Sequence, residues 1–301
     1  MSGLLDPTSL RSVANQIGLR PTKTRGQNFV HDANTVRRIV ALAGVDAHDR
    51  VIEVGPGLGS LTLGLLETGA SVVAIEIDEL LAEQLPGTVG ERMPEAADRL
   101  DLVVSDALDV TELPSPRRPC AELSGNAHGS SAPTALVANL PYNVSVPVLL
   151  HMLELSDSWT TGLVMVQLEV ADRLVAGPGS KVYGVPSAKL AWFAQAERVG
   201  TVPPKVFWPV PNVESGLVRI IRRDPPPTSA SRAQVFTVID AAFASRRKML
   251  RGALGGLCGG SARAAELIDA AGVDPTARGE SLTVTDFAAI AEVLDRAGVW
   301  G

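Results

Sequence analysis

The chain has 301 residues, of which 46% are hydrophobic and 20% charged, so it can bury a sizeable core and is not expected to be disordered. No apolar run is long enough to predict a membrane span, and the first residues lack the basic and apolar segments of a secretory signal. The two cysteines, Cys120 and Cys258, are isolated and predict neither a disulfide framework nor a zinc site. We therefore expect a cytoplasmic protein without a metal.

The formal net charge of −6 is unevenly distributed along the chain. Residues 51–140 hold 14 acidic and 4 basic side chains, whereas residues 198–251 hold 10 basic and 3 acidic ones. Residues 1–50 are also basic, with 7 basic and 4 acidic side chains. Because local fields rather than the total charge govern contact with phosphates, these two basic segments can face a nucleic acid.

In chain order, the hydrophobic pattern predicts helices that alternate with strands. A helix over Ala33–Ala43 places Val36, Ile39 and Val40 on one face. Further helices are predicted over Ser60–Leu66 and Glu79–Leu85. The predicted strands are Val51–Val54, Ser71–Ile77, Leu100–Val104, Ala135–Ala138, Gly162–Val166 and Gly216–Ile221. This alternation predicts an α/β fold with a doubly wound parallel sheet.

Two segments interrupt these patterns. Pro114–Pro133 is rich in Pro, Ser and Gly and predicts an exposed loop. Arg222–Ser231 contains three consecutive prolines and predicts a linker, after which Ala233–Trp300 has a helical pattern. We therefore expect one domain over residues 1–224 and a small all-helical domain over residues 225–301.

A glycine-rich turn follows the first strand of the sheet. Gly55, Gly57 and Gly59 let the backbone turn tightly and approach a ligand closely. The dinucleotide fingerprint needs a further Gly or Ala where this chain has Ser60, which disfavours a nicotinamide dehydrogenase. Taken alone, the turn could also be an ordinary tight loop without a ligand.

Two acidic residues follow the next two strands. Glu76 ends the second strand, where a carboxylate can accept hydrogen bonds from ribose hydroxyls, and Asp106 follows the third, where it can accept one from an adenine amine. Glu76 alone could be a solvated strand end, but its order and spacing after the glycine turn favour a nucleoside site. Acidic surroundings also suit a sulfonium cation, as in S-adenosylmethionine, and disfavour a pyrophosphate.

The segment Asn139–Tyr142 follows the fourth strand, at the edge of the sheet where ligands bind. The Asn139 side-chain oxygen and the Leu140 carbonyl can accept the two hydrogens of an adenine N6 amine, which localises its lone pair towards a methyl donor. Pro141 restricts the backbone so that both acceptors converge, and Tyr142 can stack on a flipped base. A proline turn without a catalytic role is the alternative.

Motifs along nearly the whole chain resemble those of a known family, the ribosomal RNA adenine N6-dimethyltransferases. The resemblance implies a class I methyltransferase (Rossmann-like) sheet, a small C-terminal helical domain, and S-adenosylmethionine as the cofactor. The matching segments are Gly26–Asp32, Glu53–Thr62, Ala74–Asp78, Ser105–Ala107, Asn139–Tyr142 and Val202–Ser215.

The resemblance also implies roles for individual residues. The expected cofactor-binding residues are Asn28, Val30, Gly55, Gly57, Glu76, Asp106 and Asn139. The expected catalytic residues are Asn139, Leu140 and Tyr142, with Phe207 helping to hold the target base. Leu168 departs from the family, which commonly has lysine at that position.

Two branches of this family differ in their RNA. Leu140 and the basic run Arg246, Arg247, Lys248 and Arg251 resemble the housekeeping branch, which dimethylates two adjacent adenosines in the 3′-terminal hairpin of small-subunit ribosomal RNA. We expect the run to lie on a helix, with positions 247 and 251 on one face towards RNA phosphates; a solvated charged face is the alternative. The resemblance therefore implies immature small subunits as partner, a monomer, and a part in ribosome assembly.

Two alternatives stay open at this point. One is the large-subunit branch, which confers macrolide resistance. The other is an RNA-binding or assembly factor without catalysis on the same fold, which the complete Asn139–Tyr142 segment makes less attractive as a sole role.

Overall fold

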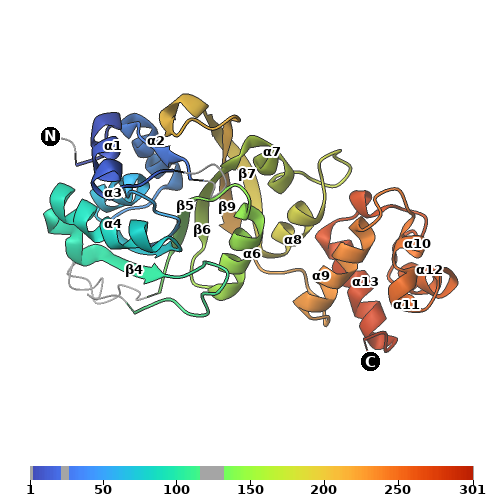
Figure 1. Ribbon diagram of the computed structural model, residues 1–301. Coiled ribbons are helices and arrows are strands. Elements are labelled where there is room, and N and C mark those ends of the chain that lie inside the picture. The colour runs from blue at the N-terminus through green and yellow to red at the C-terminus, as the bar shows by residue number, and fades with distance from the viewer. Residues whose placement is uncertain (1–2, 22–26, 116–131, 301) are drawn as a thin grey trace. The chain divides into compact units, whose positions relative to one another are not determined.

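The computed structural model describes residues 3–21, 27–115 and 132–300 (Figure 1). The chain forms two compact units. The first comprises Met1–Ala171 and Glu197–Arg222, and the second comprises Asp172–Ala196 and Arg223–Gly301. The division at Arg222 lies close to the expected domain boundary, whereas Asp172–Ala196 groups with the C-terminal helices. Most of the predicted Pro114–Pro133 loop lies outside the described residues.

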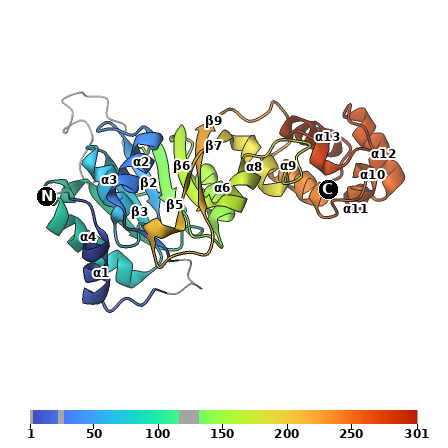
Figure 2. The same cartoon turned by 90° about the horizontal axis from the view of Figure 1, so that it is seen from above.

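The main sheet has seven strands in the order β4-β3-β2-β5-β6-β9-β7 (Figures 1 and 2). Five neighbouring strands, from β4 to β6, run parallel, and β9 runs antiparallel to β6. The predicted parallel sheet is thus confirmed for these five and corrected for β9, because a strand's hydrophobic pattern does not encode its direction. The strands are β2 (Arg50–Val54), β3 (Ser71–Glu76), β4 (Leu100–Val104), β5 (Ala135–Asn139), β6 (Thr161–Gln167), β7 (Ala194–Val202) and β9 (Ser215–Arg222).

The central strands are buried on both faces. Every residue of β2 and β3 is buried. Val51 and Val72 belong to the core that the sheet shares with α1 to α4, and Ile52 and Val73, which alternate with them, are equally buried. Burial on both faces explains why these strands read as continuous apolar runs.

The helices α1 to α4 belong to this first unit. The amphipathic pattern of α2 is confirmed over its whole length: Val36, Ile39 and Val40 are buried, the Asp32 side chain accepts a 2.7 Å bond from the Thr35 N–H, and Gly44 ends the helix at φ 69°. The helices along the first part of the chain are α1 (Pro7–Gln16), α2 (Ala33–Ala43), α3 (Ser60–Glu67), α4 (Glu79–Arg92), η2 (Pro94–Arg99), α6 (Ser145–Leu155) and α7 (Leu168–Leu174).

Helix α4 is longer than predicted, because it continues through Pro86 to Arg92. A proline removes only one helical hydrogen bond. Leu85, Thr88 and Val89 are buried on either side of it and hold the flanking turns in place.

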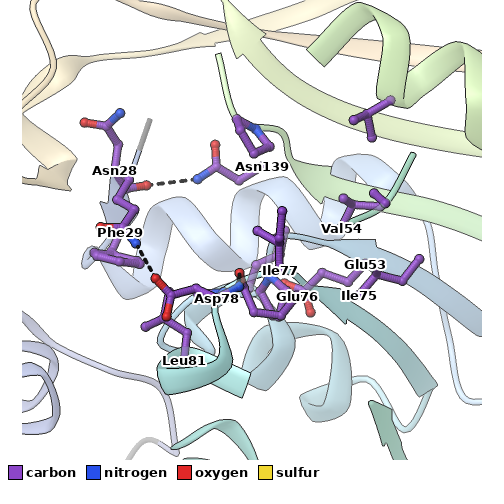
Figure 3. A pocket seen from close by; sticks show the side chains of 18 of the residues that line it. Asn28, Phe29, Glu53, Val54, Ile75, Glu76, Ile77, Asp78, Leu81 and Asn139 are labelled. Carbon is purple, nitrogen blue, oxygen red and sulfur yellow. Dashed lines mark hydrogen bonds between the residues drawn. The ribbon is translucent and has the colours of Figure 1, made fainter. Parts of the chain in front are cut away.

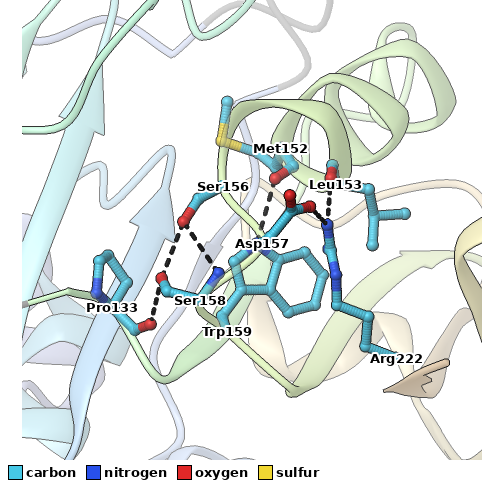
Figure 4. A network of polar contacts seen from close by, with 8 residues as sticks. All are labelled: Pro133, Met152, Leu153, Ser156, Asp157, Ser158, Trp159 and Arg222. Atoms are coloured by element: carbon cyan, nitrogen blue, oxygen red, sulfur yellow. Dashed lines mark hydrogen bonds and ion pairs between the residues drawn. The ribbon is translucent and has the colours of Figure 1, made fainter. Parts of the chain in front are cut away.

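A network of polar contacts closes the amino end of β6 (Figure 4). Arg222, the last residue of β9, donates to the Leu153 carbonyl at 2.6 Å and to Asp157 at 2.5 Å, and its guanidinium lies 5.3 Å from the centre of the Trp159 ring. The Trp159 indole N–H donates to the Met152 carbonyl at 3.1 Å. These contacts join α6, β6 and β9 at the end of β6 opposite Gln167.

The second unit is helical, as the pattern after Ala233 predicts. The ring centroid of Phe243, which is partly buried, lies 5.8 Å from that of Tyr183 and 6.0 Å from that of Phe287. None of the helices in the described part of the chain is long and apolar enough to cross a membrane. The helices are α8 (Val185–Phe193), α9 (Arg232–Phe243), α10 (Leu250–Ala253), α11 (Gly255–Cys258), α12 (Ser261–Ala270), η4 (Gly279–Ser281) and α13 (Val284–Arg296).

Candidate active site

A cavity of about 600 Å³ lies at the carboxyl ends of the parallel strands in the first unit. Strand order reverses between β2 and β5, and such a switch point is where open α/β sheets bind ligands. All seven residues expected to bind the cofactor line this cavity: Asn28, Val30, Gly55, Gly57, Glu76, Asp106 and Asn139.

The glycine turn between β2 and α3 has the left-handed backbone that its residues permit. Gly55, Gly57 and Gly59 have φ values of 70°, 57° and 93°. A Cβ on Gly57 would lie 2.6 Å from Cε1 of Phe29, which also lines the cavity. The turn therefore depends on glycine for both its conformation and its close packing.

Glu76 ends β3 and is 5% exposed. One carboxylate oxygen accepts the Gly57 N–H at 3.1 Å, and the other accepts the Asp78 N–H at 3.0 Å. Burial raises the pKa of Glu76, and these backbone bonds oppose that rise. Because Gly57 donates to a carboxylate, its N–H is not directed at a phosphate, which argues against a dinucleotide site.

The segment after β3 provides an apolar and a polar wall (Figure 3). Ile77 lines the cavity although it is 63% exposed, so it offers an apolar surface that a ligand can cover. Asp78 caps α4 through the Leu80 N–H at 3.1 Å and accepts a 3.2 Å bond from the Gln27 amide. This last bond ties the opening motif to the segment after β3.

Glu53 also lines the cavity and is 1% exposed. The Thr62 hydroxyl donates to it at 2.7 Å. Burial raises the pKa of Glu53 to about 8, and the nearby charge of Glu76 adds to the rise. Ser60 is a second polar group here: its buried hydroxyl has no hydrogen-bond partner among the described residues, so a ligand in the cavity could satisfy it.

Asn139 ends β5, and its side-chain amide is held in one orientation (Figure 3). Its Nδ2 donates to the Asn28 backbone carbonyl at 3.0 Å. Because a carbonyl can only accept, this bond identifies which end of the amide is nitrogen, and Oδ1 is the end left for other partners.

The rest of the predicted catalytic segment surrounds this asparagine. The Leu140 N–H donates to the Met165 carbonyl at 3.0 Å, and its side chain is buried. Pro141 and Asn143 line the cavity. Tyr142, between them, is half-buried and its hydroxyl lies 2.8 Å from that of Ser215. Tyr142 itself is not among the residues that line the cavity.

Phe207 does not line the cavity in this structure, and its expected role in holding the target base stays a prediction. It pairs with Val30 in a two-stranded ribbon formed by β1 (Phe29–Val30) and β8 (Phe207–Trp208), after the short helix η3 (Pro204–Val206). The Phe207 side chain is 1% exposed and belongs to the hydrophobic core.

The basic run in the second unit is also arranged differently from the predicted continuous helix. Helix α9 ends at Phe243, a turn follows in which the Lys248 N–H donates to the Ser245 carbonyl, and α10 begins at Leu250. Positions 247 and 251 therefore do not share one helical face.

Within this run, Arg246 differs from its neighbours. Its guanidinium donates to Glu280 at 2.8 Å and to the Lys181 carbonyl at 2.6 Å. All four residues of the run are exposed, so Arg246 differs from Arg247, Lys248 and Arg251 in these contacts and not in burial.

Some site residues have weak sequence signals. The Asn28–Asn139 and Tyr142–Ser215 contacts join residues 111 and 73 positions apart, which no local pattern indicates. Glu53 does have a signal, since an acidic residue inside an otherwise apolar strand is unusual, but the strand pattern alone assigns it no role.

Comparison with known proteins agrees with this geometry. Residues 19–296 match the family described as ribosomal RNA adenine dimethylase. The chain is 70% identical to ribosomal RNA small subunit methyltransferase A of Cutibacterium acnes, over 99% of this chain and 96% of that protein. It is 60% identical to the protein of the same name from Streptomyces griseus, over 96% of this chain and 94% of that protein.

Two solved structures share the fold. A dimethyladenosine transferase from Plasmodium falciparum has a TM-score of 0.70 and 19% identity, over 90% of this chain and 98% of that one. The 23S rRNA methyltransferase ErmE has a TM-score of 0.59 and 24% identity, over 89% of this chain and 99% of that one.

Proposed function

Because the chain belongs to the ribosomal RNA adenine dimethylase family, we propose that it N6,N6-dimethylates two adjacent adenosines in the 3′-terminal hairpin of small-subunit ribosomal RNA. The observation that carries the proposal is a cavity lined by Asn139, whose amide is held by Asn28, and by the acidic Glu76 and Asp106. The relatives' names favour the small-subunit RNA, since proteins 70% and 60% identical are named for it.

The cofactor is S-adenosylmethionine, and the lining residues fit it. The cavity of about 600 Å³ has the size of a small-ligand site. Glu76 can accept both ribose hydroxyls, Asp106 the adenine amine, and the exposed Ile77 can cover the adenine face. The carboxylates of Glu76 and Asp106 attract the positively charged sulfonium of the cofactor.

In this proposal the residues of the Asn139–Tyr142 segment orient the adenine N6 amine for methyl transfer. When bound, the cofactor supplies an activated methyl group, so no metal or strong base is needed. In the first transfer the Asn139 Oδ1 and the Leu140 carbonyl accept the two N6 hydrogens and localise the nitrogen lone pair; in the second, one hydrogen remains to be accepted. Each transfer releases one N6 proton to solvent. The Asn28 carbonyl keeps the amide in this orientation before the base arrives, so little reorganisation is needed.

Contact with the RNA involves the second unit in this proposal. Arg247, Lys248 and Arg251 are exposed and can neutralise phosphates. Arg246 instead holds residues of its own unit together through Glu280 and Lys181. We propose a cytoplasmic monomer that acts on immature small subunits during ribosome assembly.

Methyl transfer from labelled S-adenosylmethionine tests the substrate. We expect label in the RNA of immature small subunits and none in large-subunit RNA. Label only in large-subunit RNA would support the macrolide-resistance branch instead. Binding of small-subunit RNA without any transfer would support the assembly factor without catalysis. Calorimetry with S-adenosylmethionine and with NAD provides an independent check, and we expect heat of binding from the first alone.

A further inference from the structure

One hydroxyl pair joins the predicted catalytic segment to the start of β9. The Tyr142 Oη and the Ser215 Oγ lie 2.8 Å apart, and either can be the donor. Ser215 is completely buried, and at this end of the sheet it lies opposite Gln167, the last residue of β6. The next bond in this ladder, from the Leu168 N–H to the Glu214 carbonyl at 2.9 Å, holds the same stretch of backbone.

The position of Ser215 makes its hydroxyl a fixed anchor. A buried hydroxyl costs stability unless it is hydrogen-bonded, so this pair is favoured over either group alone. Burial raises the pKa of the Tyr142 hydroxyl, which keeps it neutral and able to donate. Tyr142 has two side-chain torsions, and a bond at the far end of its ring restricts both.

Tyr142 also lies where orientation matters. Its neighbours Pro141 and Asn143 line the cavity, and Asn139 begins the segment. A base that stacks on the Tyr142 ring needs the plane of that ring fixed relative to Asn139 Oδ1, because a small misplacement of reacting groups slows transfer.

We propose that Ser215 is a positioning residue, which orients the Tyr142 ring for the target adenine through their shared hydrogen bond. This inference rests on the proposed function, in which Tyr142 stacks on that base. Ser215 does not line the cavity, so in this proposal it acts only through the tyrosine.

A double-mutant cycle tests this dependence. Ser215→Ala and Tyr142→Phe each remove one half of the bond, and each is expected to lower kcat on immature small subunits about fivefold to tenfold, with the Kd for S-adenosylmethionine unchanged. The double variant should lose no more than either single one, because the same bond is already gone. Ser215→Thr keeps a hydroxyl and should recover most of the activity. Additive losses, or an unchanged kcat in Ser215→Ala, would overturn the proposal.

Fluorine NMR gives a readout that does not depend on activity. The chain has only two tyrosines, so 3-fluorotyrosine labelling yields two signals, and Tyr142→Phe assigns them. Ser215→Ala should move the Tyr142 signal and leave that of Tyr183, whose hydroxyl donates to the Leu282 carbonyl in the second unit. An unmoved Tyr142 signal would contradict the proposal even if the variant proved less stable.

A matched control is available at the other end of β6. Ser158 donates to the Pro133 carbonyl at 2.6 Å, and its hydroxyl lies 2.8 Å from that of Ser156 (Figure 4), so Ser158→Ala also removes the hydrogen bonds of one serine hydroxyl. It should change neither kcat nor the Tyr142 signal. If the unmodified protein methylates RNA but Ser215→Ala behaves like this control, the inference fails and the proposed function stands; absence of methylation by the unmodified protein would reject the function itself.

Discussion

The amide nitrogen of Asn139 donates to the backbone carbonyl of Asn28 at 3.0 Å, and this bond joins the opening motif of the chain to the end of β5. It sets the orientation of the side chain without using the oxygen. The acceptor proposed for the adenine amine is therefore held in place by a residue that also lines the cofactor cavity.

Asn139→Ala removes both the acceptor and the bond to Asn28. We expect kcat for methyl transfer to fall at least about 100-fold, as for loss of a preorganised donor or acceptor in other active sites. Single-turnover rates with immature small subunits measure the loss. Thermal unfolding should change little, and Asn34→Ala, on the exposed side of α2, controls for the substitution itself. Retention of full activity would reject the assigned role.

The raised pKa of Glu53 predicts that the free energy of unfolding depends on pH. Its pKa is about 8 in the folded chain, above its ordinary value of 4.5, because burial disfavours the carboxylate. Between these values the folded state binds the extra proton, so stability falls as pH rises through that window and the loss is complete above about pH 8.

Glu53→Gln mimics the neutral acid and keeps an oxygen for Thr62. We expect it to match the unmodified protein near about pH 5 and to be more stable by roughly 1–3 kcal/mol at about pH 9. Urea unfolding at the two pH values measures the difference, which separates Glu53 from Glu76 because only one of them is changed. Equal stability of the two proteins at both pH values would contradict the prediction.

Gly57 has a conformation and a close contact that another residue cannot reproduce. Gly57→Ala is expected to destabilise the fold by about 1–3 kcal/mol, because of its positive φ, and to weaken cofactor binding as Phe29 shifts. Gly90→Ala is the matched control: a Cβ there meets nothing within 4 Å, and it should be neutral or stabilise α4 by up to about 1 kcal/mol. Chemical denaturation and calorimetry test both, and a harmless Gly57→Ala would refute the packing argument.

We expect substitutions in the basic run to have two different effects, one on RNA binding and one on stability. Arg247→Ala combined with Lys248→Ala should weaken binding to the RNA hairpin and lower the slope of log K against log salt by about 2. Arg246→Ala should instead lower the stability of the second unit by up to about 1 kcal/mol, since its pair with Glu280 is partly exposed. Filter binding at several salt concentrations distinguishes them. If Arg246→Ala lowered the salt slope more than the Arg247→Ala and Lys248→Ala double variant, Arg246 would be the phosphate contact and the assigned roles would be wrong.

Local patterns predicted much of the fold. The bounds of α2 and β4 agree with prediction to the residue, because amphipathic spacing, the Asp32 cap and a short apolar run between polar flanks are local features. The direction of β9 was not predictable, since an apolar strand reads alike in either direction. The end of the basic helix at Phe243 was missed, because its turn is stabilised by contacts to Glu280 and Lys181, which are distant in sequence.

The candidate site divides in the same way. Glu76 and Asn139 end strands, and the glycine turn and Asp106 follow them, so topology alone brings these residues to one edge of the sheet. The burial of Phe207 depends on its pairing with Val30, across most of the chain, and could not be predicted from its motif.

The most direct test of the central claim is mass-spectrometric mapping of the RNA after immature small subunits have been incubated with the protein and S-adenosylmethionine. We predict two adjacent N6,N6-dimethyladenosines in the 3′-terminal hairpin, absent when Asn139→Ala replaces the unmodified protein. Finding no dimethyladenosine in that hairpin, with the cofactor bound and the subunits competent, would contradict the account.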